Sequence, residues 1–124
     1  MIELDHFILE VTDPAVAARW FHDRLGLEAV RLAEWQRGEV PFPSVRIGAA
    51  TIIDLFPPPM WRGATPSNPN HVCFAMDPER FAAFRATSDI VRSDDHNFGA
   101  RGYGSSIYVA GPDGISVEVR TYFL

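Results

Sequence analysis

The sequence SSIYVAGPDGISVEVRTY, residues 105–122, decides the fold of this chain. Two runs in which apolar and polar residues alternate flank a turn at Gly111–Gly114. Such alternation around a Pro/Gly turn predicts a half-buried antiparallel hairpin. In the second run one face carries Ile115, Val117 and Val119, and the other carries Ser116, Glu118 and Arg120. The carboxylate of Glu118 on that polar face is a candidate ligand that lines a cavity.

Length, charge and composition exclude several classes of protein. The chain has 124 residues, enough for one domain with its own core. Its net charge of −5, without a basic cluster, argues against nucleic acid as a partner. No apolar run approaches the roughly 18 residues of a membrane helix, and the acidic start is no signal peptide, so we expect a cytoplasmic protein. Cys73 is the only cysteine and lysine is absent, which excludes an internal disulfide and Schiff-base chemistry.

Apolar periodicity and turn residues predict the remaining elements. Strands are expected at 2–11, 28–34, 40–47, 50–56, 70–76 and 90–93, helices starting at Pro14 and Pro78, and a polar loop at 93–104. A proline-rich linker is expected at 57–69, too stiff for helix or sheet. Thr12 or Asp13 is expected to cap the first helix and Asp77 the second, and Gly26 is expected to end the first in a left-handed conformation.

The predicted order of strand, helix and three strands occurs twice, which indicates an internal repeat. The modules cover residues of about 1–56 and 70–124 of a single domain. His6 aligns with His71, and Asp54 aligns with Glu118. The sequence therefore predicts an α+β fold in which two βαβββ modules form a curved cup of mixed strands.

The repeat also predicts a metal site. If the halves pack about a pseudo-twofold axis, His6, His71 and Glu118 converge as a face of two histidines and one carboxylate. Asp54 occupies the fourth equivalent position. Nitrogen and oxygen donors of this kind suit one divalent ion, Fe(II), Mn(II), Ni(II), Co(II) or Zn(II), with open positions for water and substrate.

Four stretches of the chain resemble the vicinal oxygen chelate superfamily, which includes glyoxalase I, extradiol dioxygenases and bleomycin resistance proteins. They are LDHFIL at 4–9, FHDRLGLE at 21–28, NHVCFAM at 70–76 and IYVAGPDGISVEV at 107–119. The resemblance implies the glyoxalase/bleomycin resistance/dioxygenase fold, with metal ligands at His6, His71 and Glu118. It further implies a homodimer that acts on a small-molecule substrate. The implied activity is of glyoxalase/dioxygenase type, which covers lyases, isomerases and dioxygenases.

Departures from the family patterns keep other functions open. The histidine expected upstream of the closing pattern in ring-cleaving dioxygenases is missing, since Gly99, Ala100 and Arg101 occupy that window. The tract 101–108 is similar to fosfomycin resistance enzymes, which implies substrate binding by Arg101, Ser106 and Tyr108, although the lysine common in those enzymes is absent. Tyr108 and Asp54 are the candidate catalytic residues.

Simpler interpretations of the same residues also stand. Glu118 is alternatively an exposed strand acid paired with Arg120, Arg101 a solvated loop residue, Asp54 a bystander and Tyr108 a rim residue. In another class of function, the protein is a metal-free module that sequesters a ligand, as bleomycin resistance proteins do. An epoxide-opening enzyme of the fosfomycin resistance type is a further alternative.

Overall fold

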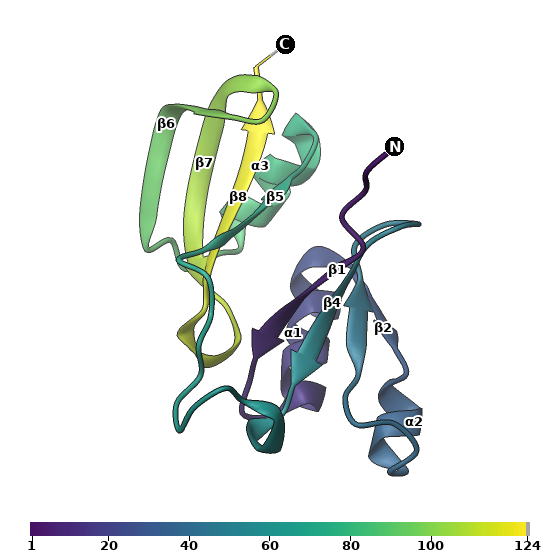
Figure 1. Ribbon diagram of the computed structural model, residues 1–124. Helices are drawn as coiled ribbons and strands as arrows, with labels where there is room; N and C mark the ends of the chain where they lie inside the picture. Colours follow the sequence, from purple (N-terminus) through teal and green to yellow (C-terminus); the bar gives the residue numbers. More distant parts are fainter. Residues whose placement is uncertain (124) are drawn as a thin grey trace. The chain divides into compact units, whose positions relative to one another are not determined.

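The computed structural model describes residues 1–123 and divides the chain into two units, Met1–Asn68 and the part from Pro69 onward. Each unit holds one four-stranded mixed sheet (Figure 1). No helix among the described residues is long and apolar enough to cross a membrane.

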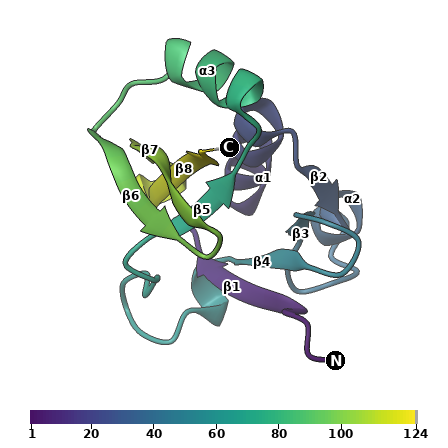
Figure 2. The same ribbon diagram turned by 90° about the horizontal axis from the view of Figure 1, so that it is seen from above.

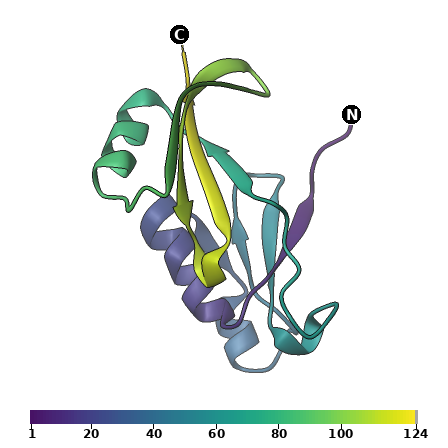
Figure 3. The ribbon, with the colours of Figure 1, turned by 90° about the vertical axis from the view of Figure 1, so that its left-hand side faces the viewer.

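In the first unit, the sheet has the strand order β1-β4-β3-β2. Its elements are β1 (His6–Glu10), α1 (Pro14–Leu25), β2 (Glu28–Val30), α2 (Leu32–Gln36), β3 (Ser44–Arg46), β4 (Ile52–Phe56) and the 3-10 turn η1 (Pro58–Met60). β1 runs parallel to β4, and the other neighbours are antiparallel. α1 lies against this sheet (Figure 3), and Phe21 is buried together with Leu9 and Ile53 of the strands.

Local sequence explains where α1 begins and ends. The Asp13 side chain accepts hydrogen bonds from the backbone N–H groups of Ala15 and Val16, and Pro14 needs no partner at the first helical position. Gly26 ends the helix at φ 70°, a left-handed conformation that favours glycine. Of the two residues predicted as the N-cap, Asp13 is the one that caps this helix, and the predicted end at Gly26 is confirmed.

In the second unit, the sheet has the equivalent order β5-β8-β7-β6. Its elements are β5 (Val72–Ala75), α3 (Pro78–Ala86), β6 (Arg92–Gly99), β7 (Gly102–Ala110), the 3-10 turn η2 (Pro112–Gly114) and β8 (Ser116–Tyr122). Phe81 and Phe84 of α3 are buried, and the helix contacts β8. α3 lies to one side of the strands of this unit (Figure 2). β5 runs parallel to β8, as β1 does to β4, so the predicted pair of βαβββ modules is confirmed.

The predicted C-terminal hairpin is formed by β7 and β8, with Tyr108 opposite Glu118 and Ser106 opposite Arg120. Val117 and Val119 are fully buried on one face. On the other face Glu118 and Arg120 are also buried, each 4 % exposed. This hairpin therefore encloses charged groups on the face that is usually solvated in a two-sided sheet.

Two predicted elements were wrong. The strand expected at 28–34 ends at Val30, because Arg31 turns the chain at φ 60° and helix-forming residues follow in α2. The polar loop expected at 93–104 instead forms β6, a tight turn and the start of β7. β6 is an edge strand with mostly exposed side chains, so its backbone pairing with β7 leaves no apolar alternation in the sequence.

Other strands are shorter than predicted. The first strand begins at His6 rather than residue 2. The strand expected at 40–47 starts only at Ser44, after Pro41 and Pro43. The segment expected to be purely a linker contains η1, and it is anchored within its own unit by Glu10. That buried carboxylate accepts hydrogen bonds from the backbone N–H groups of Arg62 and Ser67, which outweigh the effect of burial and lower its pKa.

Candidate metal and substrate site

The first unit brings together His6, at the start of β1, and Asp54, on β4. His6 Nδ1 donates to the Asp5 carboxylate at 2.7 Å, and His6 Nε2 lies 3.8 Å from Asp54 Oδ2. The buried Asp54 also accepts a hydrogen bond from Ser44 Oγ at 2.7 Å. The hydrogen bond to Asp5 raises the pKa of His6 most, and the negative charge of Asp54 raises it further.

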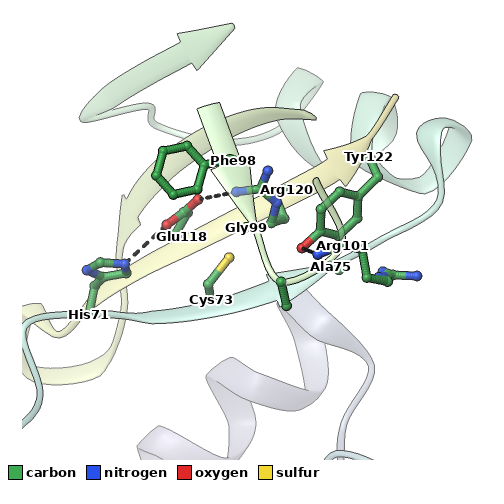
Figure 4. A pocket seen from close by; sticks show the side chains of 10 residues that line it. His71, Cys73, Ala75, Phe98, Gly99, Arg101, Glu118, Arg120 and Tyr122 are labelled. Atoms are coloured by element: carbon green, nitrogen blue, oxygen red, sulfur yellow. Dashed lines mark hydrogen bonds and ion pairs between the residues drawn. The ribbon is translucent and has the colours of Figure 1, made fainter. Parts of the chain in front are cut away.

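The second unit repeats this arrangement with His71, just before β5, and Glu118, on β8. His71 Nδ1 lies 2.7 Å from the amide oxygen of Asn70, and His71 Nε2 lies 3.2 Å from Glu118 Oε1 (Figure 4). Ser106 Oγ donates to Glu118 Oε2 at 2.6 Å. The predicted correspondence of histidine and carboxylate positions thus reappears as two matching pairs, each with a serine hydroxyl on the acid.

The residue before each histidine determines which ring nitrogen is free. Asp5 and the oxygen of Asn70 are acceptors, so Nδ1 carries the proton in both rings. In the neutral imidazole, Nε2 then presents a lone pair, and it faces a carboxylate oxygen that also presents lone pairs. A cation, either a proton on Nε2 or a metal ion, resolves this repulsion.

Hydrogen bonds and charge hold Glu118 ionised although it is buried. Burial by itself raises its pKa, but donors from Ser106, Tyr108 and Cys73 and the proximity of His71 outweigh burial and lower it. Arg120 Nη1 adds a contact with Oε2 at 3.4 Å. The simpler prediction of an exposed acid paired with Arg120 is therefore half right: the pair exists, but both residues are buried.

Tyr108 and Cys73 flank the same carboxylate. Burial and the hydrogen bond to Glu118 raise the pKa of Tyr108, so its phenol keeps its proton at neutral pH. Burial and the charge of Glu118 raise the pKa of the Cys73 thiol to about 12. Tyr108 is a hydrogen-bond donor in this site, and its ring lies edge-on to His71 with centroids 5.6 Å apart.

A pocket of about 420 Å³ lies in the second unit beside His71 and Glu118 (Figure 4). Arg101, in the turn between β6 and β7, lines it with its guanidinium 4.4 Å from the Tyr122 ring centroid. Ser106, in contrast, is fully buried beneath Glu118 and supports the carboxylate. Sequence reasoning missed Arg120 as a pocket residue, although its place two residues after Glu118 on the same strand face was a usable signal.

Comparisons with known proteins address the fold. No protein-family model matches the chain, and no curated protein matches it significantly. Among solved structures, a virulence protein from Salmonella typhimurium is 24% identical with TM-score 0.76, covering 99% of this chain and 98% of its own. A glyoxalase/dioxygenase from Nostoc punctiforme is 21% identical with TM-score 0.71 over 98% of this chain and 92% of its own. The oxidase ChaP-H1 is 26% identical with TM-score 0.68 over 99% of this chain and 98% of its own.

The chain has the fold of the vicinal oxygen chelate superfamily. The predicted resemblance to this superfamily is confirmed at the level of fold, which by itself does not specify a reaction. Within each unit of the described residues 1–123, the His, Cys, Asp and Glu side chains form no group of three that would hold a metal ion. Each unit therefore holds one pair of donors, an imidazole and a carboxylate.

The donor pairs, each a histidine nitrogen and a carboxylate oxygen, fit a divalent metal ion. Two ligand atoms about 2.1 Å from one ion and roughly at right angles lie about 3 Å apart. The 3.2 Å between His71 Nε2 and Glu118 Oε1 agrees with this separation, whereas the 3.8 Å between His6 Nε2 and Asp54 Oδ2 corresponds to a wider angle. The spacing of His71 and Glu118 accordingly fits two neighbouring ligands of one ion better than the spacing of His6 and Asp54 does.

Proposed function

We propose that this protein is a divalent-metal-dependent enzyme of glyoxalase/dioxygenase type that chelates a small substrate through two vicinal oxygens. The observation that carries the proposal is the repeated pair in which a histidine Nε2, with Nδ1 occupied, faces a buried carboxylate. A purely structural histidine does not need this arrangement twice at equivalent positions. The fold, found in a solved glyoxalase/dioxygenase, supports the same conclusion.

In this proposal His6, His71 and Glu118 hold one ion, and Asp54 takes the fourth position or remains beside it. Metal sites that act on substrates commonly have three protein ligands, and one unit supplies only two. Both units therefore contribute, either from one chain or from the two chains of a homodimer. Fe(II), Mn(II), Ni(II), Co(II) and Zn(II) all suit these donors.

When bound, the ion would supply Lewis acidity to the substrate oxygens. The protein's own side chains orient the metal ligands and determine which ligand atoms carry protons. Asp5 and Asn70 hold the imidazole tautomers, and Ser44 and Ser106 hold the carboxylates. The phenol of Tyr108, protonated at neutral pH, supplies a donor at its Oη atom beside Glu118. Arg101 supplies positive charge at the pocket for an anionic part of the substrate.

Metal content tests the proposal directly. Protein purified without chelator, incubated with Zn(II) or Mn(II) and desalted should retain about one ion per chain by elemental analysis. We expect His6→Ala and His71→Ala each to reduce retention strongly, and the double variant to abolish it. His22→Ala is the matched control, because His22 is an exposed histidine on α1 that contacts Asp23.

Two results would overturn the metal-dependent function. Wild-type protein that retains no metal would favour the ligand-sequestering alternative. Retention that is equal in the wild type and the double variant would place the metal elsewhere. Once metal is bound, assays with catechol, the methylglyoxal–glutathione adduct and fosfomycin in the presence of Fe(II), Ni(II) and Mn(II) separate the three reaction types.

A further inference from the structure

Arg120 is a buried cation on the wall of the pocket in the second unit. Its side chain is 5 % exposed, and it lies between Glu118 and Tyr122 (Figure 4). Nη1 contacts Glu118 Oε2 at 3.4 Å, Nη2 donates to the Asn97 carbonyl oxygen at 3.1 Å, and Nε has no hydrogen-bond partner among residues 1–123. A guanidinium has five N–H donors, so this buried group has fewer acceptors than it needs.

The backbone of β6 is shaped around this guanidinium. A Cβ atom added at Gly99 would lie 2.9 Å from Arg120 Cζ and 2.6 Å from Tyr122 Oη. A larger residue at position 99 would therefore displace the ends of the Arg120 and Tyr122 side chains. The Arg120 guanidinium also lies over the Tyr122 ring, 4.6 Å from its centroid. The Arg101 guanidinium lies 4.4 Å from the centroid of the same ring. Two arginines are thus stacked on one tyrosine beside the pocket.

The charge of the pocket is opposite in sign to that of the protein. Arg101 and Arg120 face a single carboxylate, Glu118, although the whole chain has a net charge of −5. If Glu118 binds a divalent ion, as in the proposed function, its charge is shared with that ion. The buried guanidinium of Arg120 then needs a second anion, because unpaired buried charges are strongly unfavourable.

We propose that this pocket binds a carboxylate group on a planar organic substrate, held by Arg120 and Arg101 beside the metal site. Arginine matches the geometry of a carboxylate through paired N–H donors. The exposed ring of Phe98 and the small residues Gly99 and Ala100 line the pocket, which leaves room for a planar body. This inference rests on the proposed function, because it places the carboxylate beside the proposed metal ion. It adds the class of substrate, a planar organic carboxylate.

A titration of ¹⁵N-labelled full-length protein with benzoate, followed by NMR, tests the assignment. Benzoate should shift the amide signals of Phe98 to Arg101 and the Nε–H signal of Arg120, with saturation. Benzamide has the same planar shape without the charge, and it should bind at least about tenfold more weakly, a difference of ~1.4 kcal/mol. Adding Zn(II) should tighten benzoate binding, since the ion removes Glu118 as a competitor for Arg120.

Charge variants locate the site. Arg120→Gln and Arg101→Gln should each weaken benzoate binding by about tenfold or more. Arg80→Gln, which removes an exposed arginine on α3 of the same unit, should leave it unchanged. A well-dispersed spectrum of Arg120→Gln verifies that it folds, and Arg101→Gln, an exposed position, gives an independent measurement.

The two proposals fail in different ways. Equal binding of benzoate and benzamide, no saturable shift in the wild type, or full binding by both arginine variants would overturn the carboxylate site. Benzoate binding in chelator without any zinc retention would retain this site and overturn the metal centre. Zinc retention without benzoate binding would do the reverse.

Discussion

Ser106 Oγ donates to Glu118 Oε2 at 2.6 Å, and both residues are buried. We expect Ser106→Ala to lower the free energy of unfolding by about 1–3 kcal/mol at neutral pH, because it removes a donor from a buried charge. Urea unfolding followed by circular dichroism measures this. Ser105→Ala, on the opposite face of β7, is the control and should cost less.

The same pair predicts a dependence on pH. The folded-state pKa of Glu118 is below its ordinary value of 4.5, so its stabilisation is present above that value and is lost as pH falls through the folded pKa. The difference in stability between wild type and Ser106→Ala should therefore shrink as the pH falls below 4.5. A difference that stays constant over this range would mean that Ser106 acts only through packing.

Cys73 should be an unreactive thiol, because its sulfur is desolvated beside Glu118 although other atoms of the residue are exposed. Because burial and Glu118 raise its pKa to about 12, the thiolate population near pH 8 is about a thousandfold lower than for an ordinary cysteine. Iodoacetamide labelling followed by mass spectrometry, in chelator, should be far slower in the folded protein than in urea. Glu118→Gln should accelerate it, and equal rates in folded and unfolded protein would contradict the assigned environment.

Gly104 and Gly114 should respond differently to alanine. A Cβ at Gly104 would overlap the carbonyl oxygen of Thr121 on the paired strand. Gly104→Ala should therefore lower the free energy of unfolding by at least about 3 kcal/mol or prevent folding. Gly114 has open space around it, and only its left-handed φ of 74° disfavours a side chain. Gly114→Ala should therefore lower the free energy of unfolding by about 1 kcal/mol. Thermal unfolding compares them, and similar melting temperatures would be inconsistent with the β7–β8 pairing.

Glu10 should control the proteolysis of the proline-rich segment. The Glu10 carboxylate accepts hydrogen bonds from the backbone N–H groups of Arg62 and Ser67. In Glu10→Gln one carboxylate oxygen becomes an NH₂ group, which is itself a donor, so one of the two N–H groups loses its acceptor. The segment should open more often, and initial tryptic cleavage after Arg62 should become about tenfold faster. Glu39→Gln, an exposed acid in the same unit, should not change the rate.

The elements that follow from local patterns were predictable. Asp13, Pro14 and Gly26 define α1 by capping and φ preference, and the alternation around Gly111–Gly114 defines the β7–β8 hairpin. β6 was missed because an edge strand is held by backbone hydrogen bonds to its neighbour, and these leave no periodic signal. The helix at Leu32–Gln36 was missed because it starts after a turn at Arg31. Arg31 adopts a left-handed conformation that cannot be predicted from its residue type.

The sequence by itself determined that the chain is a duplicated βαβββ unit and that each half carries a histidine and a carboxylate at equivalent positions. Only the tertiary structure decided that His6 faces Asp54 and His71 faces Glu118, and that Arg120 is buried without enough acceptors. The reason is physical. Periodicity and caps act between residues close in sequence, whereas the parallel pairing of β1 with β4 and of β5 with β8 sets side chains about fifty residues apart against one another.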